Sequence, residues 1–454
     1  MRTTRRRTVA VAVTLVLVFA VAACGNSSSE SKPTTTTAGT DGGSDGGGDT
    51  TLPGEKVAVD APGVTDDEIK VGGVASVDNP LGGKYGDSFA GVKAYFDMIN
   101  ASGGIYGREL KLVAERDDKA FNNSTEVEAL LTEDIFAVLP VATLLFTGAQ
   151  KLVDEGIPTF GWIINPEWEG SEENPKANLF GQTGSYLCFD CAAPGLPWLV
   201  GQAKAHKVGL LGYSVPQSAG CVDGVKNSFD EYGERVDAEI AFVDQSLQFA
   251  QKDLSVQVSK MKDAGVDFVA TCMDTGGVIT LAKEMKKQRL DAVQSLPNAY
   301  DQDFLDEYGD LFEGSFVRTD FTTFELPEED QPPGLKTFLE KMDEAGVTPS
   351  ENAIVGWLNA DLFVTGLKKA GPAFDQQKLI DAINSITDYT ADGIVYPVDW
   401  TKAHTETNDE DHNCQFFSVV RDSEFVPEYS KPGKPFVCPV VKPDELGTRY
   451  TAED

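Results

Sequence analysis

Basic residues are scarce in this sequence of 454 residues. It holds 38 lysines and arginines against 72 aspartates and glutamates, which gives a formal net charge of −34. Four of the arginines, at positions 2, 5, 6 and 7, stand at the very start of the chain. Because phosphate groups would repel so acidic a protein, the composition argues against binding to nucleic acid.

Histidine is nearly absent, which limits metal chemistry. The three histidines are His206, His404 and His412, and the pair Cys188 and Cys191 in "CFDC" lacks the second ligand pair that a zinc site needs. We therefore expect no metal and no cofactor.

Motifs for phosphate binding and nucleophilic catalysis are also missing. "GGKY" lacks the leading glycine of a P-loop and the Ser/Thr after Lys84, "VGGVAS" is not G-x-G-x-x-G, and no G-x-S-x-G occurs. The paired acids in "ERDDK" are most simply a solvated surface in a chain this acidic. We therefore expect that the protein is not an enzyme.

Only one long apolar run is present, at residues 9–23. It follows the four arginines and is shorter than the roughly 20 residues of a membrane-spanning helix, which indicates an export signal at residues 1–23. "VAAC" at its end resembles the lipobox of bacterial lipoproteins, so Cys24 is the expected lipidation site; the alternative is an ordinary signal peptide with a chance cysteine. Residues 24–66 are poor in large apolar side chains and are expected to form a flexible tether.

The remaining cysteines number six, as suits disulfides in an exported protein: Cys188, Cys191, Cys221, Cys272, Cys414 and Cys438. Cys414 and Cys438 flank two extended segments around a turn, so we expect these two to pair. The other four leave three connectivities open.

Short apolar runs alternate with amphipathic ones from Ile69 onward. "IKVGGVA" reads as a strand and "SFAGVKAYFDMINASGG" as a helix ending at its glycines. "TEVEALLTED", with Thr125 and Glu128 at capping-box spacing, reads as another helix. In the second half, Val258 and Met261, and then Val278, Leu281, Ala282 and Met285, mark inward helix faces. The pattern predicts an α/β fold of two doubly wound, Rossmann-like lobes with parallel sheets.

Ligands of open α/β sheets bind beyond the carboxyl ends of the strands. The loops expected there are residues 76–86, 142–146, 161–167, 213–220, 272–277 and 297–303.

Residues 69–118 carry a family resemblance. A strand, a loop ending in Tyr85-Gly86, a helix ending in "INASGGIYG" and a strand ending in Asp117-Asp118 follow one another. This order resembles the start of the branched-chain amino-acid type of ABC-transporter substrate-binding protein, the type I periplasmic-binding-protein fold. "LVDEGIPTFG", "LSVQVSKMKDAGVDFV" and "GLKKAG" are similar to later segments of that family.

The resemblance implies a clamshell of two lobes joined by three crossings, here near residues 184–187, 319–323 and 412–416. Lobe one would comprise residues 67–185 plus 322–412, and lobe two residues 186–321 plus 413–454. Ligand would bind between the lobes and stabilise closure.

In amino-acid binders of this family, a hydroxyl-rich loop of lobe one holds the carboxylate and an acidic residue of lobe two meets the amine. Here "VATLLF" retains only Thr143, and the acidic position falls at Asn298. Without a buried counter-charge an ammonium group would be left unpaired at a cost of a few kcal/mol. We therefore expect a ligand other than a simple branched-chain amino acid.

The candidate ligand-binding residues are Tyr85, Thr143, Trp162, Asn165, Tyr186, Gln217, Asp274, Asn298, Tyr300 and Trp357. The aromatic residues would supply apolar walls, the uncharged polar ones hydrogen bonds, and Asp274 a negative group for a cationic ligand.

By this resemblance the chain is a monomeric, lipid-anchored receptor on the extracytoplasmic face of a bacterial cell membrane, delivering a small molecule to an ABC permease and its ATPase. The alternatives are a sensor with the same clamshell and, more distantly, a surface hydrolase.

Overall fold

The computed structural model describes residues 56–405, 414–442 and 445–449. The export signal, Cys24, His412 and most of the expected tether lie outside the described residues. The strands are β1 Glu68–Ala75, β2 Glu109–Asp117, β3 Ala137–Ala142, β4 Thr159–Gly161, β5 Leu179–Gly181, β6 Lys207–Tyr213, β7 Glu239–Leu247, β8 Phe268–Cys272, β9 Val293–Leu296, β10 Phe316–Thr319, β11 Phe416–Arg421, β12 Glu424–Glu428, β13 Cys438–Lys442 and β14 Glu445–Arg449.

The helices follow most of the strands. They are α1 Asp87–Ala101, α2 Asn123–Leu130, α3 Ala149–Asp154, α4 Gly195–Gln202, α5 Pro216–Tyr232, α6 Ser255–Ala264, α7 Thr275–Gln288, α8 Gln302–Tyr308, α9 Pro333–Ala345, α10 Glu351–Ala370 and α11 Gln376–Ile383, with short 3-10 turns at Pro166–Trp168, Gly233–Val236 and Gly309–Leu311.

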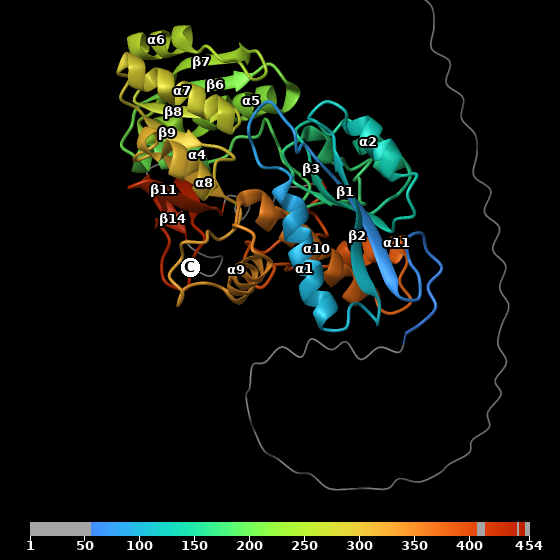
Figure 1. The fold of residues 1–454 in the computed structure, drawn as a ribbon. Coiled ribbons are helices and arrows are strands. Elements are labelled where there is room, and N and C mark those ends of the chain that lie inside the picture. Colours follow the sequence, from blue (N-terminus) through green and yellow to red (C-terminus); the bar gives the residue numbers. More distant parts are fainter. Residues whose placement is uncertain (1–55, 406–413, 443–444, 450–454) are drawn as a thin grey trace, which may run out of the picture. The chain divides into compact units, whose positions relative to one another are not determined.

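Of the three sheets in the described residues, the two large ones each form the centre of one lobe (Figure 1), and the third is the two-stranded pair β13-β14. The first lobe contains the all-parallel order β2-β1-β3-β4-β5. The second lobe contains β12-β11-β10-β9-β8-β6-β7, which is parallel from β7 to β10 and antiparallel at β11 and β12. The predicted α/β class with two parallel-rich lobes is confirmed.

Helix α10 comes late in the chain but packs against α1 of the first lobe, where the orange and light-blue helices lie side by side in Figure 1. Glycines make this contact possible. A Cβ on Gly91 would come within 1.9 Å of the Ala353 carbonyl oxygen, and one on Gly356 within 2.0 Å of that of Ser88. The backbones therefore meet without side chains between them.

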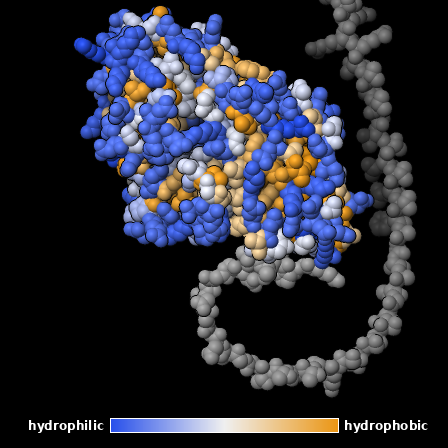
Figure 2. All heavy atoms as spheres, in the orientation of Figure 1, coloured by the Kyte–Doolittle hydropathy of each residue, from blue (hydrophilic) through white to orange (hydrophobic). Residues whose placement is uncertain are grey.

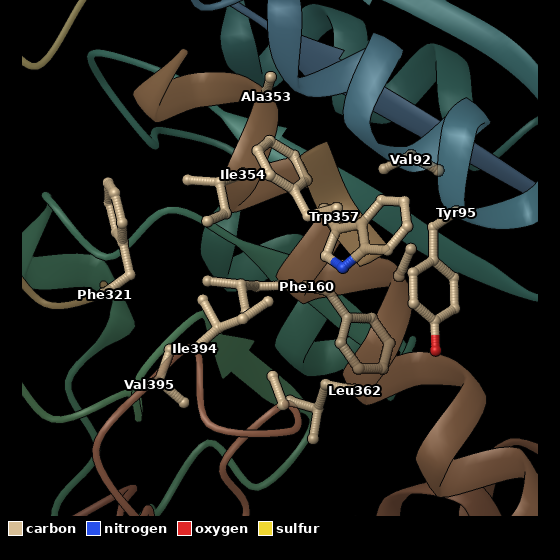
Figure 3. Close-up of a cluster of buried hydrophobic side chains, with 14 of the residues drawn as sticks. Val92, Tyr95, Phe160, Phe321, Ala353, Ile354, Trp357, Leu362, Ile394 and Val395 are labelled. Carbon is tan, nitrogen blue, oxygen red and sulfur yellow. The ribbon is translucent and has the colours of Figure 1, made fainter. Parts of the chain in front are cut away.

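The main core of the first lobe lies beneath these helices (Figure 3). Trp357 of α10 packs edge-on against Tyr95 of α1, with ring centroids 4.7 Å apart, and Phe160 of β4 lies among the same side chains. The surface seen in Figure 2 is largely hydrophilic, with apolar residues in small separate patches. Among the described residues, no helix is both long and apolar enough to cross a membrane.

The predicted inward faces are confirmed: Val258 and Met261 of α6 are buried, as are the four apolar positions of α7. The predicted capping box is wrong. Helix α2 begins at Asn123, because a turn closed by the Asn122 N–H donating to the Asp118 carbonyl oxygen (2.8 Å) starts it before Thr125.

The expected pairing of Cys414 with Cys438 is confirmed. Of the three open connectivities, the structure contains the one that joins Cys188 to Cys191 and Cys221 to Cys272.

Candidate functional site

Two cavities lie where loops from both sheets meet. The first, of about 530 Å³, is lined on one side by residues 80–85 after β1 and on the other by the start of α7 and residues after β9. The second, of about 340 Å³, is lined by Gln182, Thr183, Tyr186 and Leu187 after β5, by Arg318 to Asp320 at the end of β10, and by Cys414 and Gln415 before β11. Most of the predicted rim loops thus reach one cavity or the other.

A shared wall separates the two cavities. Trp162, Asn298 and Glu351 line both. Trp162 follows β4 of the first lobe, and Asn298 follows β9 of the second. Glu351 is the first residue of α10. The residue before it, Ser350, caps this helix, and its hydroxyl accepts the Ala353 N–H at 3.2 Å. The two cavities are therefore neighbouring compartments of one cleft.

Aromatic rings form part of the first cavity. Tyr85 and Trp162 lie with their ring centroids 5.4 Å apart, and each is less than 5% exposed. Burial, with the charges of Asp274 and Glu351, raises the pKa of the Tyr85 hydroxyl far above its ordinary value, so this side chain stays neutral. Tyr85 and Trp162 give an apolar, uncharged surface for a ligand.

Tyr300 also lines the first cavity, but its hydroxyl is already engaged. It donates to the Glu325 carboxylate at 2.7 Å and accepts the Phe324 N–H at 2.6 Å. The ring and not the hydroxyl is what this residue offers a ligand. Tyr186 lines the second cavity.

Thr143 and Asn165 lie behind the cavities and line neither. Thr143 donates to the buried carboxylate of Asp118, which also accepts hydrogen bonds from Ser76 (2.7 Å) and Asn123 (3.0 Å). The Leu144 N–H donates to the Ser76 hydroxyl at 3.0 Å. The Thr143 hydroxyl of the predicted carboxylate-holding loop is therefore engaged by Asp118 and not directed to a ligand.

Asp274 caps α7. Its Oδ1 accepts the N–H groups of Gly276 (2.8 Å) and Gly277 (3.2 Å), and burial raises its pKa although these bonds and nearby Tyr213 act to lower it. Asp274 lies behind the first cavity, whose wall here is Thr275 and Gly276.

Gln217 bridges the lobes by donating to the Leu144 carbonyl oxygen at 2.8 Å. Trp357 is placed in the core of the first lobe, 2% exposed, on neither cavity wall (Figure 3). The apolar periodicity around Trp357 is compatible with a position in the core and with one on a cavity wall, so the sequence alone did not distinguish these two positions.

Sequence reasoning missed the charged residues of the second cavity: Arg318, Asp320 and Glu351. The cleft therefore has two half-buried carboxylates, of Asp320 and Glu351, that the expected loss of a counter-charge at Asn298 did not take into account. Burial, and then the charge of Asp320, raise the pKa of Glu351 to about 8. Glu351 begins a helix and follows no strand, so a search of strand ends could not find it. Asp320 lies within the predicted crossing at residues 319–323 and Arg318 directly before it, in a segment that predicts a hinge and not a ligand contact.

Only one group of potential metal ligands occurs among the described residues, formed by Cys188, Asp190 and Cys191. Both sulfurs are joined in a disulfide, so neither offers a thiolate to a metal ion.

A family model described as "Periplasmic binding protein" matches residues 68–424, more than half of the chain. The chain belongs to the periplasmic binding protein family. This confirms the resemblance seen in residues 69–118, and it places the chain among binding proteins and not among enzymes. None of the curated proteins matches this sequence.

Solved structures of periplasmic binding proteins share the fold. A branched-chain amino acid ABC transporter protein from Thermus thermophilus with bound valine is 19% identical, with a TM-score of 0.64, covering 81% of this chain and 96% of that one. A fatty acid ABC transporter substrate-binding protein from Thermomonospora curvata is 19% identical, with a TM-score of 0.65, covering 84% and 97%. A leucine-, isoleucine-, valine-, threonine- and alanine-binding protein from Brucella ovis is 15% identical, with a TM-score of 0.62, covering 81% and 96%.

Proposed function

We propose that this protein is a lipid-anchored, extracytoplasmic receptor that captures a small organic ligand between its lobes and delivers it to an ABC importer. The observation that carries the proposal is the two-compartment cleft, whose walls come from strand-end loops of both sheets. A ligand touching both walls would bind only when the lobes approach, and so would favour the closed state that a permease could recognise.

The lobes are taken to span residues 67–185 plus 322–412 and residues 186–321 plus 413–454. The strand order supports this division, since the first sheet ends with β5 at Gly181 and the second contains β6 to β12. Helices α9 and α10 contact α1 and so belong with the first lobe.

Cys24 is the proposed lipid attachment, and the tether after it would keep a monomeric receptor close to its permease and ATPase without restraining lobe movement. A Cys24→Ser chain should then leave the membrane fraction and appear in the soluble one, while the native chain stays with the membrane.

The ligand is proposed to be other than a simple branched-chain amino acid. The support comes from the loops after β1 and β3, where the hydroxyls of Ser76 and Thr143 and the Leu144 N–H form hydrogen bonds within the protein. Solved structures with this fold include a branched-chain amino acid ABC transporter protein with bound valine and a fatty acid ABC transporter substrate-binding protein, so the scaffold accommodates different chemistries.

A thermal-shift screen of the full chain tests the proposal, using amino acids, aromatic acids, amides, polyamines and small sugars. Ligand at 100 times its Kd should add about 2.7 kcal/mol of stability. A shift with leucine or valine would overturn the ligand assignment, and a panel with no shift would count against the receptor itself. Uptake of the ligand should fail in cells that lack the protein; intact uptake would favour a sensor.

A further inference from the structure

The second cavity contains charges of both signs, and each has only neutral hydrogen-bond partners in the part of the chain that the structure describes. Asp320 accepts hydrogen bonds from Gln182 Nε2 (2.9 Å) and Thr183 Oγ1 (2.7 Å). Arg318 Nη1 donates to Gln415 Oε1 at 3.2 Å. Glu351 Oε2 accepts the Tyr300 N–H at 3.4 Å.

All three side chains are half-buried, and removal from water makes it costly to keep them charged. Burial raises the pKa of Asp320 and lowers that of Arg318, and burial together with Asp320 raises the pKa of Glu351. Arg318 forms no ion pair with either acid, although all three line the same cavity. Charged groups that are partly removed from water without a counter-ion are disfavoured unless a ligand of opposite charge pairs with them.

A polar group on the same wall is also incomplete. Thr271 at the end of β8 is only 9% exposed, and its hydroxyl has no hydrogen-bond partner among the described residues. Buried hydroxyls are nearly always paired, so a missing partner points to something that enters from outside.

The rest of the wall is apolar. Ile163, Leu196, Val225 and Leu296 line the cavity between its charged residues. A methylene chain would pack well against such a surface. The wall therefore favours a ligand whose charged groups are joined by an apolar chain.

We propose that Glu351 and Asp320 bind a cationic nitrogen of the ligand, that Arg318 binds an acidic group of the same molecule, and that an apolar spacer separates the two. This deepens the proposed function and rests on it. The ligand would lie beside the hinge crossings and away from the loop after β3. Glu351 would provide the charged contact from the first lobe.

Isothermal titration of the full chain with a matched series tests the assignment: 5-aminopentanoate, pentanoate, 1-aminopentane and leucine. We expect 5-aminopentanoate to bind at least tenfold more tightly than the other three. Glu351→Gln and Asp320→Asn should each weaken 5-aminopentanoate at least tenfold and leave pentanoate unchanged. Arg318→Gln should weaken 5-aminopentanoate and leave 1-aminopentane unchanged.

Glu329→Gln is the matched control, because Glu329 is exposed and lines neither cavity. Its affinity should equal that of the native chain. Circular dichroism and melting curves establish that each variant is folded, and the two acid variants test the cation site independently.

Three results would overturn the assignment. If both acid variants bind 5-aminopentanoate like the native chain, or if only a neutral compound from the thermal-shift panel binds, the charge assignment fails while the receptor function stands. If no small molecule binds at all, both fail.

Discussion

At the scale of single residues, the buried carboxylate of Asp118 ties together the loops that follow β1, β2 and β3. Ser76 and Thr143 donate to it from two of these loops, the Ala120 N–H donates from its own loop, and Asn123 donates from the start of α2. This acid therefore sets the shape of the first lobe's strand-end edge without touching either cavity.

Asp118→Ala should lower the free energy of unfolding by about 3 kcal/mol, because it leaves several buried donors without an acceptor. Urea denaturation measures this. Asp117→Ala is the control: Asp117 accepts the Val77, Asp78 and Lys119 N–H groups near the surface, where water can replace it. Equal losses for the two variants would contradict the argument.

Glu351 should make the stability of the ligand-free protein depend on pH. Its folded pKa of about 8 lies above the unfolded value near 4.3, so the folded state binds the proton more tightly. The stabilisation is complete below about pH 4 and is lost as pH rises to about 8. Glu351→Gln should flatten this fall.

Urea midpoints at pH 5, 6, 7 and 8 check this prediction. Glu329→Gln, at an exposed glutamate, serves as the control and should follow the native curve. A Glu351→Gln curve that falls as steeply as the native one would show that the carboxylate is not held protonated. Asp320, Asp361 and other acids with raised pKa keep their own contribution in all three proteins.

At the scale of elements, the disulfides differ in the length of chain that they close. Cys221–Cys272 joins α5 to the end of β8 across 51 residues, whereas Cys188–Cys191 spans 3. A longer loop restricts the unfolded chain more. Both bonds lie near the second cavity, since Cys221 lines it and the Cys188 loop follows Leu187 on its wall.

Replacing Cys221 and Cys272 by serine should lower the free energy of unfolding by about 4 kcal/mol, and replacing Cys188 and Cys191 by about 2 kcal/mol. Chemical denaturation of both double variants gives the comparison. The reverse order would mean that strain or residual structure in the unfolded chain outweighs loop length.

At the scale of the whole molecule, backbone and ionic contacts hold the two lobes together beside the first cavity. The Gly276 N–H at the start of α7 donates to the Leu81 carbonyl oxygen at 3.0 Å. Lys84 forms ion pairs with Asp301 (3.0 Å) and Asp303 (2.6 Å). Burial acts to lower the pKa of Lys84, but the hydrogen bonds and charges of these aspartates raise it.

Gly276→Ala should loosen this contact, because its Cβ would come within 2.6 Å of the Leu81 oxygen. We expect several-fold weaker ligand binding and an unchanged unfolding midpoint without ligand, since neither lobe's interior is altered. Calorimetric titration and a melting curve test the two halves of this prediction. Unchanged affinity would mean that the bound state does not use the contact.

Much of the fold could be read from local patterns. Alternating apolar runs identified β1, α1, α6 and α7, because amphipathic periodicity depends only on neighbours along the chain. The pairing of Cys414 with Cys438 was readable since an extended hairpin brings its ends together. Tyr85, Trp162, Asn298 and Tyr300, from the predicted rim, do line the cleft.

The sequence by itself determined the α/β class, the two lobes, the family and the strand-end loops that form the cleft. Only the tertiary structure decided which side chains face its cavities. Thr143 donates its hydroxyl to the buried Asp118, and Trp357 packs against Tyr95 in the core. Glu351 lines the same cavity as Asp320 and Arg318. The reason is physical: burial and charge pairing depend on residues that are distant in the chain and meet only after folding.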